Sequence, residues 1–197
     1  LKKSEDELTA LSQAGLKLAY IGIESGNDEL LKKVSKHQTA EKIVEAFHKC
    51  FRTGITPSGT IILGLAGDDK ELSAKHIKES AELVNQLSPV HVIADGGKLP
   101  PWYISCLALM VPPGTPIAGY VSEEKFVQAG AAQILGEMKI FMENISDDVQ
   151  KCIFRSNHAS NYLPLAGTLC KDKQKLLDQI NKTIENKNIT PEAFRGL

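Results

Sequence analysis

Apolar residues along this chain follow two alternating spacings, which predict helices and strands in turn. Stretches with apolar positions three or four residues apart predict helices over residues 4–14, 28–33, 39–52 and 71–87. Short continuous apolar runs predict buried strands over residues 18–23, 56–65 and 103–111. Strands that alternate with helices of this length are typical of parallel βα units, so the first half predicts an α/β fold.

Polar residues at the predicted helix ends support these boundaries. Ser4 and Glu7 have the spacing of a capping box, and Thr39 stands where the third helix needs an N-cap. Gly15 and Gly54 follow two of the helices, and glycine readily adopts the conformation that ends a helix. The sequence therefore marks the ends of these helices as well as their interiors.

The pattern changes after the proline-rich corner PPGTP. Residues 122–145 and 171–186 have helical apolar spacing, whereas residues 147–154 fit a helix or a strand. We therefore divide the chain into a βα-barrel part, residues 1–120, and a helical C-terminal extension with a polar loop, residues 121–197.

The number of predicted strands limits the architecture. Three to four parallel strands fit a doubly wound sheet or a partial (β/α) TIM-type barrel, and they are too few for a complete barrel. A partial barrel predicts an open edge at the strand over residues 18–23, where further strands would pair. A complete α/β binding domain predicts no open edge and a closed pocket. An interaction module predicts an apolar surface in place of a cleft.

Composition and charge argue against several classes of protein. The 197 residues have a formal net charge of −1, which argues against a nucleic-acid partner. No apolar run approaches the ~18 residues of a membrane helix. The chain starts at Leu1 without a methionine or a signal-peptide pattern, so we expect it to be trimmed or to begin inside a longer protein. Four widely spaced cysteines favour reduced thiols in the cytoplasm.

Candidate chemistry lies on the loops that follow the strands, because parallel βα folds bind ligands at the carboxyl ends of their strands. These loops fall within residues 22–28, 59–69 and 104–116. Glu24 either accepts hydrogen bonds from a ligand or, together with Ser25, caps the next helix. Gly64 and Gly67 either form a simple turn or leave room for a ligand.

Four motifs occur in a specific order within residues 10–120: GIES from Gly22, NDELL from Asn27, ILGLAG from Ile62 and PGTP from Pro113. In this order and spacing the chain resembles the radical S-adenosylmethionine (SAM) superfamily. It is most similar to the branch of oxygen-independent coproporphyrinogen III oxidase and the elongator catalytic subunit. The resemblance implies a partial βα barrel of an iron–sulfur oxidoreductase that cleaves SAM reductively to a 5′-deoxyadenosyl radical.

The resemblance also implies which residues face SAM: Glu24 and Ser25 along its amino-acid and ribose side, Thr60 in the same cavity, and Gly64 and Leu65 near its adenine. Ser105 and Leu107 are expected to line the last strand of the site. No residue of the chain is assigned a catalytic role.

The chain departs from the family pattern because CxxxCxxC is absent. It therefore cannot hold the 4Fe–4S cluster in the family's way, and we expect neither the cluster nor SAM to be bound to this fragment, which should be inactive alone. The cysteine motif is expected upstream of Leu1. The expected partners are the N-terminal remainder of the same protein, an external electron donor and a small-molecule or unknown substrate.

Two further segments carry open alternatives. Residues 92–102 resemble an insertion, in which Asp95-Gly96-Gly97 forms either a hairpin-like turn, which we favour, or a substrate-side loop. His158 lies in the polar stretch SNHASNYLPL, which either connects two elements or holds a substrate through hydrogen bonds.

Overall fold

The structure is a computed structural model that describes residues 2–94 and 96–196. The helices are α1 (Glu5–Gln13), α2 (Asp28–Lys33), α3 (Ala40–Arg52), α4 (Lys70–Gln86), α5 (Pro116–Ser122), α6 (Ala131–Asn144) and α7 (Leu169–Asn186). The strands are β1 (Leu18–Glu24), β2 (Thr56–Leu63), β3 (Trp102–Ala108), β4 (Cys152–Ser156) and β5 (Leu165–Thr168). Two 3₁₀ turns cover Pro89–His91 and Glu192–Phe194. Among the described helices, none is long and apolar enough to cross a membrane.

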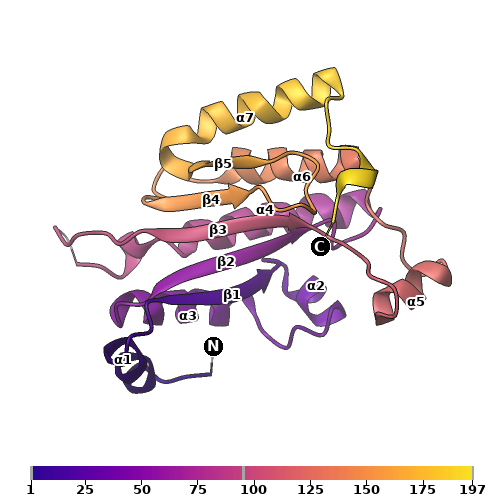
Figure 1. Cartoon of the computed structure of the whole chain (residues 1–197). Coiled ribbons are helices and arrows are strands. Elements are labelled where there is room, and N and C mark those ends of the chain that lie inside the picture. The colour runs from indigo at the N-terminus through magenta and orange to yellow at the C-terminus, as the bar shows by residue number, and fades with distance from the viewer. Residues whose placement is uncertain (1, 95, 197) are drawn as a thin grey trace.

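The strands form a single sheet in the order β1-β2-β3-β4-β5. The first four strands are parallel, and β5 is antiparallel to β4. Figure 1 shows α3, α4 and α6 behind the sheet, whereas its near face carries no helix. This arrangement confirms the predicted α/β class and parallel βα units, with five strands in place of the three to four expected.

The core lies between the sheet and the helices and is centred on Trp102. This residue is fully buried at the start of β3. The rings of Phe47 and Phe51 on α3 meet its ring edge-on, with centroids 6.2 and 6.1 Å away. The indole N–H donates a hydrogen bond to the carbonyl of Gln150 at 2.8 Å. One side chain therefore connects the helix layer, the sheet and the segment that leads into β4.

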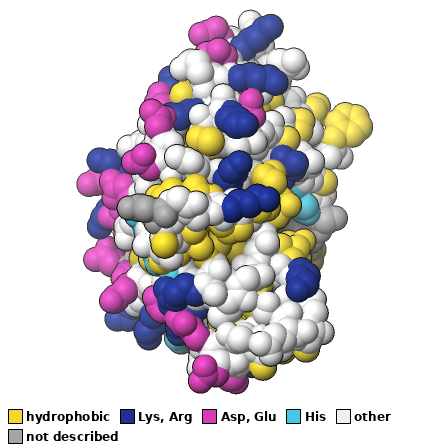
Figure 2. Space-filling view, turned by 90° about the vertical axis from the view of Figure 1, so that its left-hand side faces the viewer, with side chains coloured by type: hydrophobic (Ala, Val, Ile, Leu, Met, Phe, Trp, Pro, Cys, Tyr) yellow, Lys and Arg dark blue, Asp and Glu magenta, His cyan; other side chains and the backbone are white. Residues whose placement is uncertain are grey.

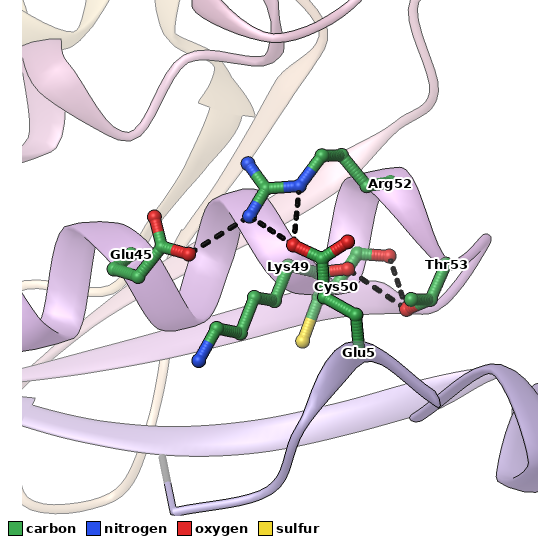
Figure 3. A network of polar contacts seen from close by, with 6 residues as sticks. All are labelled: Glu5, Glu45, Lys49, Cys50, Arg52 and Thr53. Carbon is green, nitrogen blue, oxygen red and sulfur yellow. Dashed lines mark hydrogen bonds and ion pairs between the residues drawn. The ribbon is translucent and has the colours of Figure 1, made fainter. Parts of the chain in front are cut away.

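Helix α1 is attached to α3 through an arginine. The capping box of α1 forms as predicted between Ser4 and Glu7. Arg52 donates from Nε to Glu5 Oε1 at 2.8 Å and from Nη2 to Glu45 Oε1 at 2.8 Å, as Figure 3 shows. Because these groups are partly exposed, we expect the network to orient α1 more than to stabilise it.

Strand β1 was expected to be buried, and this expectation is wrong for most of the strand. Tyr20 is 80% exposed and Leu18 is exposed as well, whereas Ile23 is fully buried. The physical reason is that, among the described residues, β1 has a strand neighbour on one side only and its outer face is uncovered. The open edge expected of a partial barrel at this strand is therefore present.

The segment over residues 121–197 contains more than the predicted helices. It contributes α6 and α7, and it also adds β4 and β5 to the sheet. The ambiguous stretch at residues 147–154 contains the start of β4, where Cys152 pairs with Trp102 of β3. The sheet therefore continues across residue 120, and α6 packs against α4 from the first half of the chain.

The loop before β3 lies at the end of the sheet where the strands begin, away from their carboxyl ends. The Gly97 N–H donates to the Ala94 carbonyl at 2.8 Å, which is a turn hydrogen bond, and Asp95 of the predicted turn lies outside the described residues. Figure 2 looks onto this end of the molecule and shows a band of hydrophobic side chains beneath it. In this position the loop is remote from a ligand bound at the carboxyl ends of the strands.

Candidate functional site

A cavity of about 510 Å³ lies at the carboxyl ends of β1, β2 and β3. Its walls come from the end of β1, the loop between α2 and α3, the segments that follow β2 and β3, and the loop between β4 and β5. The lining residues are Glu24, Val34, Ser35, Lys36, Ile62, Leu65, Leu107, Ala108, Leu109, Met110, His158 and Ser160. The cavity is therefore mainly apolar, with a few polar groups at its margins, which is the usual composition of a small-molecule site.

An ion pair forms one margin of this cavity. Lys36 Nζ donates to Glu24 Oε1 at 3.0 Å, and both side chains are about one quarter exposed. Glu24 has a φ of +64°, a left-handed conformation that is costly for a residue with a Cβ. A Cβ on Gly22 would meet Glu24 Oε1 at 2.3 Å and Lys36 Nζ at 2.8 Å. The absence of a side chain at Gly22 thus leaves space for the Glu24 carboxylate, which lies over β1 beside Lys36.

Ser25 does not line the cavity, although it was predicted to face SAM. Its side chain is fully buried on the α4 side, where its hydroxyl lies 2.7 Å from His76 Nδ1 and accepts the Asn27 N–H at 2.9 Å. The alternative, in which Glu24 and Ser25 cap the next helix, is wrong because the N-cap of α2 is Asn27. Asn27 Oδ1 accepts the Leu30 N–H at 2.8 Å.

The buried network fixes His76 in one neutral form. Its Nε2 lies 3.1 Å from the Ile62 carbonyl, which can only accept, so Nε2 carries the proton and Nδ1 accepts from Ser25. Burial lowers the pKa of His76 from 6.5 to about 4, although the hydrogen bond to Ile62 opposes this shift. His76 therefore ties α4 to both β1 and β2 as a neutral side chain.

The turn at residues 25–27 lies directly on the backbone of α4. The Gly26 N–H donates to Ser80 Oγ at 2.8 Å, and Asn27 Nδ2 donates to Glu79 Oε2 at 2.5 Å. A Cβ on Gly26 would meet the carbonyl oxygen of Glu79 at 2.3 Å. The GIESGND motif is therefore a close packing contact for half of its length, and its cavity-lining residue is Glu24.

Thr60 lies on the open face of β2, two residues before Ile62, which lines the cavity. In the sheet register it is opposite Gly22 on one side and Ser105 on the other. The next pair on the same face, Ile62 and Leu107, does line the cavity. The expected residues Thr60 and Ser105 thus share a face with the site without forming its wall.

Leu65 and Gly64 take different positions after β2. Leu65 lines the main cavity, whereas Gly64 lines a neighbouring cavity of about 330 Å³. Gly64 has a φ of +75°, and a Cβ there would meet Ile134 Cδ1 at 2.6 Å. The loop after β2 therefore lies at the site, and the left-handed backbone at Gly64 favours glycine there.

A buried carboxyl on α6, which the sequence did not indicate, holds this loop. Glu137 is 1% exposed, and its Oε2 accepts the Gly64 N–H at 2.7 Å while its Oε1 lies 2.5 Å from Ser73 Oγ. Burial raises the pKa of Glu137 from 4.5 to about 7, although both hydrogen bonds oppose this shift. Its spacing on an otherwise apolar helix face is the one signal that could have revealed it.

The cysteines present do not fit an iron–sulfur cluster. Cys50, Cys106 and Cys152 are buried, and Cys170 is partly exposed. Burial raises the pKa of all three buried thiols, which opposes the thiolate form that a cluster needs. Across residues 2–94 and 96–196, no group of histidine, cysteine or acidic side chains is arranged to hold a metal ion.

Comparisons with known proteins agree with the sequence motifs. The family model described as the radical SAM superfamily matches residues 2–84 of this chain. The solved structure of the archaeal Methanocaldococcus infernus Elp3 with an N-terminal deletion (1–46) is similar, with a TM-score of 0.61 and 14% sequence identity. The match covers 95% of this chain and 40% of that one. The chain thus has the fold of a partial radical SAM barrel. No curated protein matches the sequence.

The first prediction concerns the contact between the 25–27 turn and α4. Gly26→Ala should lower the free energy of unfolding by about 2–3 kcal/mol, because the new methyl group meets the helix backbone, which cannot move aside cheaply. Gly136→Ala is the matched control. No atom lies within 4 Å of a Cβ at that position of α6, so it should stabilise by about 0.5–1 kcal/mol. Urea unfolding of both variants measures the difference, and equal effects would contradict the close contact.

The second prediction concerns pH. The folded state keeps the proton on Glu137 up to about pH 7, whereas the unfolded chain keeps it only up to about pH 4.5. The contribution of the protonated carboxyl to the stability of the fold is therefore lost as the pH rises through this range. Glu137→Gln cannot titrate, and its amide reproduces the protonated acid, donating to Ser73 and accepting from Gly64. As the pH rises from 4.5 to 7, the free energy of unfolding of the variant should therefore increase relative to that of the wild type by up to about 3 kcal/mol. Glu143→Gln, the same substitution at an exposed position of the helix, is the matched control for the loss of a carboxylate.

Proposed function

We propose that this chain is part of a cytoplasmic radical SAM iron–sulfur enzyme. We further propose that the residues around its 510 Å³ cavity form the wall against which the adenosyl part of SAM lies. The single observation that carries the proposal is the position of Glu24 and Leu65. Both belong to motifs of the superfamily, and both line one cavity at the carboxyl ends of the strands.

The lining supports an adenosyl ligand on chemical grounds. Ile62, Leu65 and Leu107 offer apolar contacts to a flat base. The Glu24 carboxylate has one oxygen engaged by Lys36 and can accept a hydrogen bond from a ribose hydroxyl with the other. These residues would bind and orient SAM and keep water from it, and none of them is assigned a step of the reaction.

The cluster itself does not fit the residues of this chain, so no step is derived through it. In the superfamily a 4Fe–4S cluster supplies the electron for reductive SAM cleavage. We propose that cysteines outside these 197 residues supply that cluster, with an external electron donor and a small-molecule or other substrate as further partners. On this proposal the chain alone is inactive. It spans 40% of the length of the Elp3 chain that it resembles, so the substrate of the whole protein is left open.

A second function is supported by the same cavity. The pocket is formed by residues of this chain alone, and no metal-binding group lies among the described residues. A small-molecule-binding α/β domain without cluster chemistry would have the same lining. The two functions differ in whether the ligand is an adenosyl compound and whether an iron–sulfur cluster is present in the intact protein.

The third prediction tests the role of Glu24. In the intact protein, reconstituted anaerobically, Glu24→Ala should weaken SAM binding about tenfold, because a charge-assisted hydrogen bond contributes about 1.5 kcal/mol. Equilibrium binding of SAM measures the effect. Glu29→Ala is the control, since Glu29 on α2 is largely exposed and outside the cavity. SAM affinity that Glu24→Ala leaves unchanged would remove Glu24 from the cofactor site.

A further inference from the structure

The SNHASNYLPL stretch, which begins at Ser156, joins β4 to β5 at the same end of the sheet as the cavity. Its buried residue Asn161 anchors it to β3. Asn161 Oδ1 accepts the Ala108 N–H at 2.8 Å, and its Nδ2 donates to the Cys106 carbonyl at 2.9 Å. The side-chain amide continues the hydrogen bonding of β3 beyond its pairing with β4, so two hydrogen bonds tie the loop to the end of this strand.

The C-terminal segment anchors the loop a second time. The Arg195 side chain is 5% exposed, and its Nε donates to the Ser160 carbonyl at 2.7 Å. Its guanidinium carbon lies 3.9 Å from the centre of the Tyr162 ring, a cation–π contact. Tyr162 in turn donates to Glu192 at 2.6 Å. Two independent sets of contacts therefore fix the residues that this loop presents to the cavity.

The residue so presented is His158, and its hydrogen bonds define its tautomer. His158 Nδ1 lies 3.1 Å from the Ser160 N–H, which can only donate, and 3.0 Å from the Ser160 hydroxyl, which can donate or accept. The backbone N–H therefore assigns Nδ1 as the unprotonated nitrogen. The neutral ring then carries its proton on Nε2. No hydrogen bond of Nε2 is found within the described part of the chain. His158 is exposed and contributes to the lining of the cavity, so its Nε2–H is free to bond to a ligand.

The rest of the lining indicates what this donor would meet. The order of the strands places Glu24 and His158 on either side of the ends of β2 and β3, with Leu65 and Leu107 between them. Glu24 and Lys36 neutralise each other, and of the residues that the structure describes no other lysine, arginine or acidic residue lines the cavity. An anion here would exchange its hydration for an apolar wall and would meet the Glu24 carboxylate.

We propose that His158 is a ligand-binding residue that donates a hydrogen bond from Nε2 to an uncharged acceptor oxygen, such as a carbonyl, of a mainly apolar small molecule. This assignment rests on the proposed function in one respect: it places His158 on the substrate side of the cavity, and the proposed function places the adenosyl group of SAM in the same cavity. The hydrogen bond itself requires only the residues of this chain.

Two NMR measurements on the chain test the proposal. Imidazole ¹⁵N shifts at pH 8.5 should show Nε2–H for His158. Cyclohexanone, a neutral probe with one acceptor oxygen, should then shift the His158 resonances saturably. His91, whose Nε2 is already bonded to the Asn85 carbonyl at the other end of the sheet, should not respond. Cyclohexanecarboxylate, the anionic counterpart, should bind more weakly.

Variants separate binding from folding. His158→Ala should weaken cyclohexanone binding about fivefold, the loss expected for one hydrogen bond. His158→Gln, which keeps a donor near the position of Nε2, should restore much of it. An Nδ1–H tautomer, no response of His158 to cyclohexanone, or tighter binding of the carboxylate would each overturn the proposal. S-adenosylhomocysteine, tested separately on the intact protein, reports on the adenosyl site, so its failure to bind would count against the proposed function alone.

Discussion

The structure depends on the close approach of the turn after β1 to helix α4. Gly26 makes this approach possible because a side chain there would overlap the helix backbone. Ser25, Asn27, His76 and Ser80 then satisfy the polar groups that the contact buries. With this turn in place, the chain leaves β1 at a defined angle, and Glu24 is directed toward the cavity while the rest of the motif faces the core.

The conformation of Glu24 shows how this contact is used. A left-handed backbone at a glutamate is unfavourable by about 1 kcal/mol or more, and such strain is most often found at functional positions. Here the space above Gly22 and the ion pair with Lys36 hold the carboxylate in place. The loop that carries Lys36 includes two further residues with left-handed backbone, Ser35 and His37. The backbone at this margin of the cavity is therefore strained.

Two buried ionisable groups support the loops next to the site, and their contributions to stability depend on pH in opposite directions. His76 stabilises the fold as a neutral base, and this contribution is lost as the pH falls from 6.5 toward 4. Glu137 stabilises it as a neutral acid, and its contribution is lost as the pH rises from 4.5 toward 7. Because the two ranges overlap, their effects on overall stability oppose each other. The two groups act on different loops, His76 on the turn after β1 and Glu137 on the loop after β2.

The sequence by itself determined the α/β class, the helix and strand positions of the first half, and the family motifs, because periodicity, caps and glycines act locally. It also indicated Glu24 and Leu65, which follow predicted strands. Only the tertiary structure decided that Ser25 faces α4, that β1 is an exposed edge, and that β4 and β5 complete the sheet. These outcomes depend on contacts between residues 51 to 73 positions apart, such as Ser25 with His76 and Gly64 with Glu137. No local pattern encodes which partner such a polar residue will meet, because burial and pairing are set by the packing of the whole chain.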